Sequence, residues 1–170
     1  MDRSLTDLLA TASVRLEPAG RKHARQLARC MREKDKIEIR ASGGFIPEPA
    51  VRASINRSEE AYAAYVGDDL IAVFGVVRHA KQGVSIPWAM TSEHLPQHAL
   101  TFWRASKLTV NYLRDRHPCM MNMIHARYTE ALNWLARLGF KICQPETYGR
   151  SGDLFCRAEL YTDKLEVARV

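Results

Sequence analysis

Residues 128–140 read YTEALNWLARLGF, and this stretch is the starting point for the fold. Ala131, Leu132, Leu135 and Leu138 recur at helical spacing, so they predict an amphipathic helix over residues 128–138 with one apolar side. Gly139 follows directly and is expected to end the helix in the left-handed conformation that glycine adopts without strain. Phe140 then opens a strand. The stretch therefore predicts a helix that turns tightly back onto a sheet.

The segments on either side of this helix predict an α/β chain with a mixed sheet. Working outward, the patterns predict strands at 13–18, 61–66, 70–77, 84–91, 120–125, 140–143 and 154–161, and helices at 21–36, 49–55 and 98–116. The middle strands form a meander, and the later ones alternate with helices. We expect a mixed, mostly antiparallel sheet with helices on both faces, in a single domain over residues 1–170 with an arm at residues 1–12.

The net charge indicates which partners the chain can bind. The chain has 170 residues and a formal net charge of +6. This charge favours an anionic partner, namely a phosphorylated cofactor, a nucleic acid or an acidic protein. The basic residues of segment 21–36 give nucleic acid a route to bind, but no recognition motif accompanies them, so we expect none bound. No apolar run approaches the roughly 20 residues that span a bilayer.

The cysteines and histidines predict neither a metal site nor a disulfide framework. The four cysteines are scattered without a CxxC pair. His94 and His98 have the spacing of two metal ligands on a helix, but Pro96 lies between them and argues against a regular helix there. Residues 1–12 lack the basic and apolar regions of a secretion signal. We expect a reducing, cytoplasmic location.

The element order, together with Ala131 and the Gly139–Phe140 pair, resembles the GNAT acyltransferase fold. In that family a small residue on this helix lets it lie against the pantetheine arm of acetyl-CoA. Closer similarity is to GNAT-like proteins of tailed bacteriophages, some of them internal virion proteins. The tracts that carry it are residues 35–42 (DKIEIRAS), 88–91, 102–106 (FWRAS), 125–140 and 148–149, with Gly152 and Phe155. If the chain is phage-encoded, the resemblance implies the host cytoplasm or the virion as its location.

The resemblance implies a place for the cofactor. The strand at 84–91 would splay from its neighbour near Pro87, and its backbone from Trp88 through Ala89 and Met90 to Thr91 would bind pantetheine. The pyrophosphate would lie at residues 92–100, where backbone amides and a helix N-terminus favour anions. The side chains expected to assist are His98, Arg104 and Lys107, with Ala131 beside the pantetheine arm.

Two departures from the family pattern concern the chemistry. Residues 92–100 (SEHLPQHAL) contain no glycine, although phosphates usually lie against a glycine-rich loop, and Glu93 brings negative charge there. The position that often carries a tyrosine acid is Leu135, which cannot donate a proton. Tyr128 lies two turns earlier and is not expected to replace it.

Acyl transfer to an amine also needs a base. The candidates are Glu38, expected in a loop-side region facing the acceptor, Glu93 at the end of the splayed strand, and His125 at a strand end. Each also has an ordinary structural explanation, as a surface carboxylate or a hydrogen-bonded helix-entry histidine.

Two functions follow from these observations. The first is a GNAT-like N-acyltransferase that moves an acetyl group from acetyl-CoA to an amine on a small molecule or a protein. The second is a phage protein that keeps the fold without catalysis and serves a virion or host partner. An open gap beside residues 88–91 would favour the first, and a gap filled by side chains the second.

Overall fold

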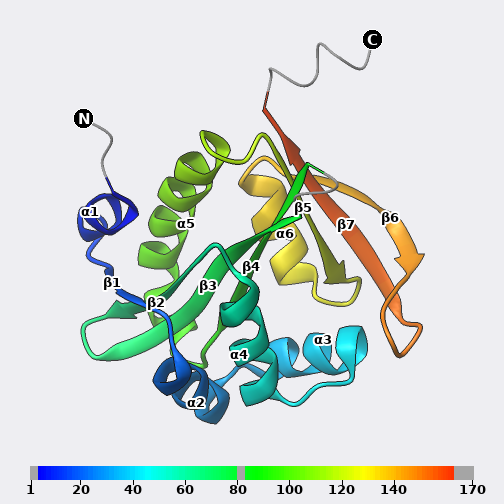
Figure 1. Ribbon diagram of the computed structural model, residues 1–170, viewed down its shortest axis with the longest axis horizontal. Coiled ribbons are helices and arrows are strands. Elements are labelled where there is room, and N and C mark those ends of the chain that lie inside the picture. The colour runs from blue at the N-terminus through cyan, green and yellow to red at the C-terminus, as the bar shows by residue number, and fades with distance from the viewer. Residues whose placement is uncertain (1–3, 80–82, 163–170) are drawn as a thin grey trace.

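The computed structural model describes residues 4–79 and 83–162 (Figure 1). Residues 1–3 of the expected arm therefore lie outside the described residues, and the rest of that arm includes a helix. In chain order the elements are α1 Leu5–Ala10, β1 Arg15–Pro18, α2 Arg21–Cys30, α3 Glu33–Gly43, α4 Pro47–Arg57, β2 Glu60–Val66, β3 Asp69–His79, β4 Val84–Thr91, the 3-10 helix η1 Leu95–His98, α5 Ala99–Arg114, β5 Cys119–His125, α6 Thr129–Arg137, β6 Lys141–Thr147 and β7 Leu154–Tyr161.

The strands form one mixed sheet in the order β1-β2-β3-β4-β5-β7-β6. Strands β1 to β4 pair antiparallel with their neighbours, and so do β5, β7 and β6. The β4–β5 pair at the centre is parallel. The expected mixed, mostly antiparallel sheet is confirmed, and the single parallel pair lies where the meander ends and the chain crosses over through α5.

Helices cover both faces of the sheet, as Figure 1 shows, with α2, α3 and α4 on one face and α1, α5 and α6 on the other. Leu27 and Val51 fill the first face beneath β3, together with Val73. Leu135, the residue of the opening motif that is most buried on α6, packs into the second face. Both interfaces are apolar, so burial of this surface stabilises the whole layered arrangement.

The expected helix over residues 21–36 is wrong in one respect, because it is two helices. Met31 is extended, with φ −66° and ψ 138°, and forms an isolated bridge with Ser92. The Arg32 N–H donates to the Thr91 carbonyl at 3.1 Å, and the Glu93 N–H donates to the Cys30 carbonyl at 2.7 Å. These contacts with the end of β4 interrupt an otherwise regular helical pattern.

The second of these helices, α3, continues past residue 36, where the predicted helix ended. It ends at Gly43, and Gly44 adopts a left-handed φ of +70°. The loop between β6 and β7 then holds its last turn, because Arg150 N–H donates to the Ser42 carbonyl at 3.0 Å and Ser151 N–H to the Ala41 carbonyl at 3.1 Å. This placement turns the first half of α3 toward the ends of β4 and β5.

Candidate functional site

The central strands β4 and β5 separate after their first pairing. Within residues 83–162 their register has one position, Ser85 opposite Met120. The hydroxyl of Ser85 lies 2.8 Å from Nδ1 of the buried His117, which fixes this apex. One step further, the Asn122 side chain bridges the widening gap, because its Nδ2 donates to the Pro87 carbonyl at 2.9 Å and its Oδ1 accepts from Met123 N–H at 2.8 Å. Beyond Asn122 the strands diverge.

A cavity of about 820 Å³ opens in this splay. Residues from both helical layers line it, so it passes through the sheet rather than lying on one face. From β4 and α6 the lining includes Trp88, Ala89, Met90, Thr91, Ala131, Trp134 and Leu135. The four β4 residues and Ala131 are positions that the sequence assigned to the cofactor, and the structure brings them together.

Two carboxylates of α3 hold the separated strand ends. The Asp35 carboxylate accepts from the Thr91 hydroxyl at 2.5 Å and from Thr91 N–H at 3.2 Å, so it caps β4. The Glu38 carboxylate accepts from His125 N–H at 2.9 Å, so it caps β5. The two residues are one helical turn apart, which places both side chains on one face of α3. Glu38 therefore lies on a helix at the cavity wall, not in the loop-side region that the sequence indicated.

Burial shifts the proton affinity of both carboxylates upward. Desolvation raises the pKa of Glu38 to about 7, and the neighbouring Asp35 charge adds to that rise, while the hydrogen bond from His125 opposes it. Desolvation also raises the pKa of Asp35 to about 6, against the lowering effect of its Thr91 hydrogen bonds. A carboxylate whose pKa lies near neutrality can accept a proton and release it again at physiological pH.

Tyr128 adds a hydroxyl to the same wall. The residue is 8% exposed, lines the cavity and interacts with Asp35 and Thr91. Burial and the nearby Asp35 raise the pKa of its phenol, so the hydroxyl keeps its proton at neutral pH. The sequence pattern did not place Tyr128 near the chemistry, because it treated Tyr128 as a helical residue two turns before Leu135. In the structure α6 begins at Thr129, so Tyr128 precedes the helix.

The open edge of β4 fits an extended chain of amides. Pro87 and Thr91 direct their backbone groups toward the splay, as their bonds to Asn122, Asp35 and Arg32 show. Strand residues alternate, so the Ala89 peptide groups between them face the same side. Ala89 itself is exposed although it lies in a central strand. Among the described residues no side-chain or loop hydrogen bond is made to Ala89.

A buried donor on α6 supports the same fit. Among the described side chains, Trp134 Nε1 is the buried polar atom that lacks a hydrogen-bond partner, and Trp134 lines the cavity. Its ring stacks on Phe102 of α5, with centroids 5.3 Å apart. A buried N–H without an acceptor is costly, so an amide carbonyl entering the cavity would restore its bond. These residues fit the pantetheine arm of a coenzyme A thioester.

The loop between β4 and α5, where the pyrophosphate was expected, offers few free amides. Ser92 N–H donates to the Ile71 carbonyl, Glu93 N–H to Cys30, and Leu95 N–H to Ser92. The His94 N–H donates to the Ser92 hydroxyl, and the Gln97 N–H to the His94 carbonyl. Pro96 has no N–H to give. The amides of residues 92–95 and 97 are thus already taken, by acceptors in the loop and in β3 and α2.

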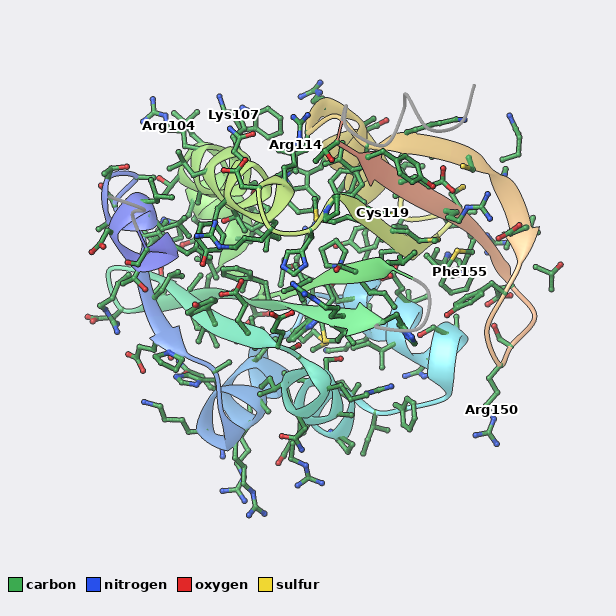
Figure 2. All side chains as sticks on the ribbon, turned by 45° about the horizontal axis from the view of Figure 1, so that its top comes forward. Arg104, Lys107, Arg114, Cys119, Arg150 and Phe155 are labelled. Atoms are coloured by element: carbon green, nitrogen blue, oxygen red, sulfur yellow. The ribbon has the colours of Figure 1, made fainter. Side chains whose placement is uncertain are left out.

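The other predicted site residues lie away from the cavity lining. His98 Nε2 is 2.8 Å from a carboxylate oxygen of Asp69. Arg104 and Lys107 are exposed, and Figure 2 shows both side chains projecting outward from α5, away from the sheet. Glu93 is exposed as well.

His125, the third base candidate, is buried and does not line the cavity. Its ring packs edge-on against Phe155. Its Nδ1 accepts from Arg127 N–H at 3.3 Å, and its Nε2 is 3.6 Å from an Asp153 oxygen. The backbone of His125 makes two bonds to residues that line the cavity, from its N–H to Glu38 and from the Tyr128 N–H, at 2.8 Å, to its carbonyl.

Comparison with known proteins places the fold. No family model matches the chain, and no curated protein matches its sequence. Solved structures do match. A ribosomal-protein alpha-N-acetyltransferase in complex with coenzyme A is 10% identical over 89% of this chain and 95% of its own, with a TM-score of 0.67. The spermidine N-acetyltransferase from Vibrio cholerae, in complex with CoA and spermine, is 10% identical over 90% of this chain and 98% of its own, with a TM-score of 0.66.

A third structure carries the family name. An acetyltransferase assigned to the GNAT family, from Chromobacterium violaceum, is 13% identical over 91% of this chain and 90% of its own, with a TM-score of 0.66. The expected GNAT acyltransferase fold is confirmed. At such low identity the likeness establishes the fold, and chemistry has to be argued from the residues of the cavity.

The described residues show neither a metal-binding cluster nor a membrane-spanning helix. Within residues 4–79 and 83–162, no three His, Cys, Asp or Glu side chains are grouped so that they could hold a metal ion. None of the helices in that part of the chain combines the length and the apolar character that a membrane crossing requires.

Proposed function

We propose that this chain is an N-acyltransferase that moves an acetyl group from acetyl-CoA to an amine. The observation that carries the proposal is the braced splay of β4 and β5, which holds a cavity of about 820 Å³ with Glu38 on its wall. The solved structures with this fold include two complexes with coenzyme A, which supports the choice of cofactor.

Five residues of β4 and α6 would hold the cofactor. The Ala89 peptide on the open edge of β4 would pair with the pantetheine amides, flanked by Trp88 and Met90. Trp134 Nε1 would donate to a pantetheine carbonyl, and Ala131 would let α6 lie close to the arm. Once bound, acetyl-CoA supplies the activated acyl group as a thioester.

Glu38 is the proposed base. An amine acceptor reaches the active site as an ammonium ion, which must lose a proton before it can attack a carbonyl carbon. A carboxylate with a pKa near 7 can take that proton at neutral pH, and the Asp35 carboxylate beside it attracts the cation. Tyr128 is the proposed hydroxyl donor on the same wall, in place of the Leu135 side chain. His125 positions Glu38 through its backbone amide.

The acceptor class remains an amine on a small molecule or a protein. The neighbouring structures include enzymes named for spermidine and for a ribosomal protein, so the fold accommodates both sizes. In this chain the acceptor would enter from the α3 and α4 side, where Ser54 and Arg57 also line the cavity.

Calorimetric titration with coenzyme A and acetyl-CoA tests the proposal first. We expect binding of both, together with a thermal shift at saturating ligand. Release of free thiol from acetyl-CoA in the presence of a panel of polyamines and peptides then tests transfer. Glu38→Gln should keep binding and lose turnover, whereas Glu93→Gln, on an exposed carboxylate, should change neither. Absence of heat and thermal shift at millimolar ligand would overturn the proposal.

A second candidate function rests on the closed loop at residues 92–97 and on Leu135 at the usual acid position. Both favour a protein that keeps the fold for a virion or host partner, in line with the resemblance to phage internal proteins. This candidate expects the chain in purified virions or bound to a host protein, and no effect of Glu38→Gln on that association. Retention of coenzyme A by the purified protein would count against it.

A further inference from the structure

We propose that Arg32 and Lys34 form a phosphate site at the mouth of the cavity, and that Glu130 occupies this site until the diphosphate of the cofactor displaces it. The inference deepens the proposed function and rests on it. It assigns the phosphate contacts to the α2–α3 junction rather than to the loop before α5.

Three charged side chains form the cluster. Arg32 Nη2 lies 2.7 Å from one carboxylate oxygen of Glu130, and Lys34 Nζ lies 2.7 Å from the other. Each oxygen of one carboxylate is therefore held by a separate cation. Lys34 Nζ also lies 5.8 Å from the centre of the Tyr128 ring. The two cations lower the pKa of Glu130, so it is an anion at neutral pH.

The cluster lies where the strands of the splay end. Arg32 and Glu130 both line the cavity. The Arg32 backbone is fixed to the last residue of β4 by its 3.1 Å bond to the Thr91 carbonyl. Glu130 is in the first turn of α6, the helix that follows β5. The ion pairs thus join the two sides of the opening, opposite the apex at Ser85.

The same arrangement suits a diphosphate better than a carboxylate. Two cations hold the single carboxylate of Glu130, and Arg32 also interacts with the carboxylate of Asp35. A diphosphate carries more negative charge than one carboxylate, so it would gain more from the two cations than Glu130 does. The first turn of a helix of nine residues adds the positive end of its dipole. The side chains of Arg32, Lys34 and Glu130 are 20%, 44% and 56% exposed, so a ligand can reach them. Exposed ion pairs contribute little to stability, and Glu130 can leave at small cost.

The hydrogen bonds within residues 92–97 favour a phosphate site elsewhere. The amides of residues 92–95 and 97 already donate within the chain, and the Glu93 side chain is exposed. The cations expected to help there, Arg104 and Lys107, point away from the cavity.

Calorimetric titration of matched double variants tests the site. Arg32→Gln with Lys34→Gln removes the cations at the mouth, and Arg104→Gln with Lys107→Gln removes the same charge from α5. We expect the first pair to weaken coenzyme A binding about tenfold or more and to leave pantetheine, which lacks the diphosphate, unchanged. The second pair should match the unaltered protein for both ligands. Equal effects of the two pairs on coenzyme A would refute the inference.

Glu130→Gln gives a result of opposite sign that misfolding cannot mimic. Removing the competing carboxylate should tighten coenzyme A binding about threefold to tenfold, while unchanged or weaker binding contradicts the proposal. If the unaltered protein binds no coenzyme A, the proposed function fails, and inorganic pyrophosphate then decides on the anion site alone. Pyrophosphate binding that Glu130→Gln strengthens and the Arg32 and Lys34 double variant abolishes supports the site, and no binding to any of these proteins overturns it.

Discussion

Replacing Glu38 by glutamine should stabilise the protein at alkaline pH while it removes the proposed base. The pKa of Glu38 is about 7 in the folded chain against an ordinary 4.5. A raised carboxyl pKa means that the folded chain binds the proton more tightly than the unfolded chain, so stability falls as the pH rises from about 4.5 to about 7. Each pKa unit corresponds to about 1.4 kcal/mol, so the loss above pH 7 is about 3 kcal/mol.

Glutamine is neutral at every pH and keeps an oxygen that can accept the His125 N–H. We therefore expect Glu38→Gln to raise the free energy of unfolding by about 2–3 kcal/mol at pH 8 and by less than about 1 kcal/mol at pH 5. For a chain of this length the gain at pH 8 corresponds to a melting temperature about 5–10 °C higher. Urea denaturation at both pH values measures the difference, and Glu93→Gln is the matched control with no expected change. A variant equally or less stable at pH 8 would show that Glu38 is not a desolvated carboxylate.

Three further predictions concern the apex, the open strand edge and the β6–β7 loop. Burial lowers the pKa of His117, so stability should fall as the pH drops below about 6.5, and urea denaturation of His117→Gln should show a flatter pH dependence. Ala89→Trp places a large side chain on an exposed position in the splay, so it should abolish coenzyme A binding in a calorimetric titration while the melting temperature stays within about 2 °C. Gly149 has a φ of +77°, and a Cβ there would lie 2.8 Å from backbone atoms of α3. Gly149→Ala should therefore cost about 2–3 kcal/mol in urea denaturation, more than Gly83→Ala, where φ is +61° and a Cβ meets nothing within 4 Å.

Patterns local in sequence predicted the architecture because each element carries its own signal. The strands β4 and β7 have the predicted bounds, 84–91 and 154–161. The opening motif predicted α6 and its glycine end, and Gly139 adopts φ +97°. The positions assigned to pantetheine on β4 came from the resemblance to the GNAT acyltransferase fold, with Pro87, a residue that weakens strand pairing, where the splay would begin. Together these signals were sufficient for the fold.

Contacts between distant segments could not be predicted in the same way. The break at Met31 depends on pairing with Ser92, and nothing in the helical pattern of residues 21–36 reveals it. Helical spacing shows that Arg104 and Lys107 share a face of α5, but it does not show that this face turns to solvent. The roles of Asp35, Asn122 and Tyr128 likewise arise from the ends of two strands that meet only in the folded chain.

The splay itself argues for a ligand. Separating two central strands leaves their backbone groups without the partners that a continuous sheet would supply, which is unfavourable unless other groups replace them. This chain replaces them selectively. Asn122 satisfies the edges next to the apex, and Asp35 and Glu38 satisfy the far ends, at the expense of desolvating two carboxylates.

Between these braces the Ala89 peptide and Trp134 Nε1 are left facing the cavity. A scaffold with no ligand would be more stable if a side chain closed this middle section as well, because the same kinds of residue close both ends. The open section is therefore best explained by a ligand that carries amide groups of its own. The pantetheine arm carries such amide groups. The open section therefore distinguishes the proposed enzyme function from the virion or host scaffold function more directly than the absence of glycine from residues 92–100 does.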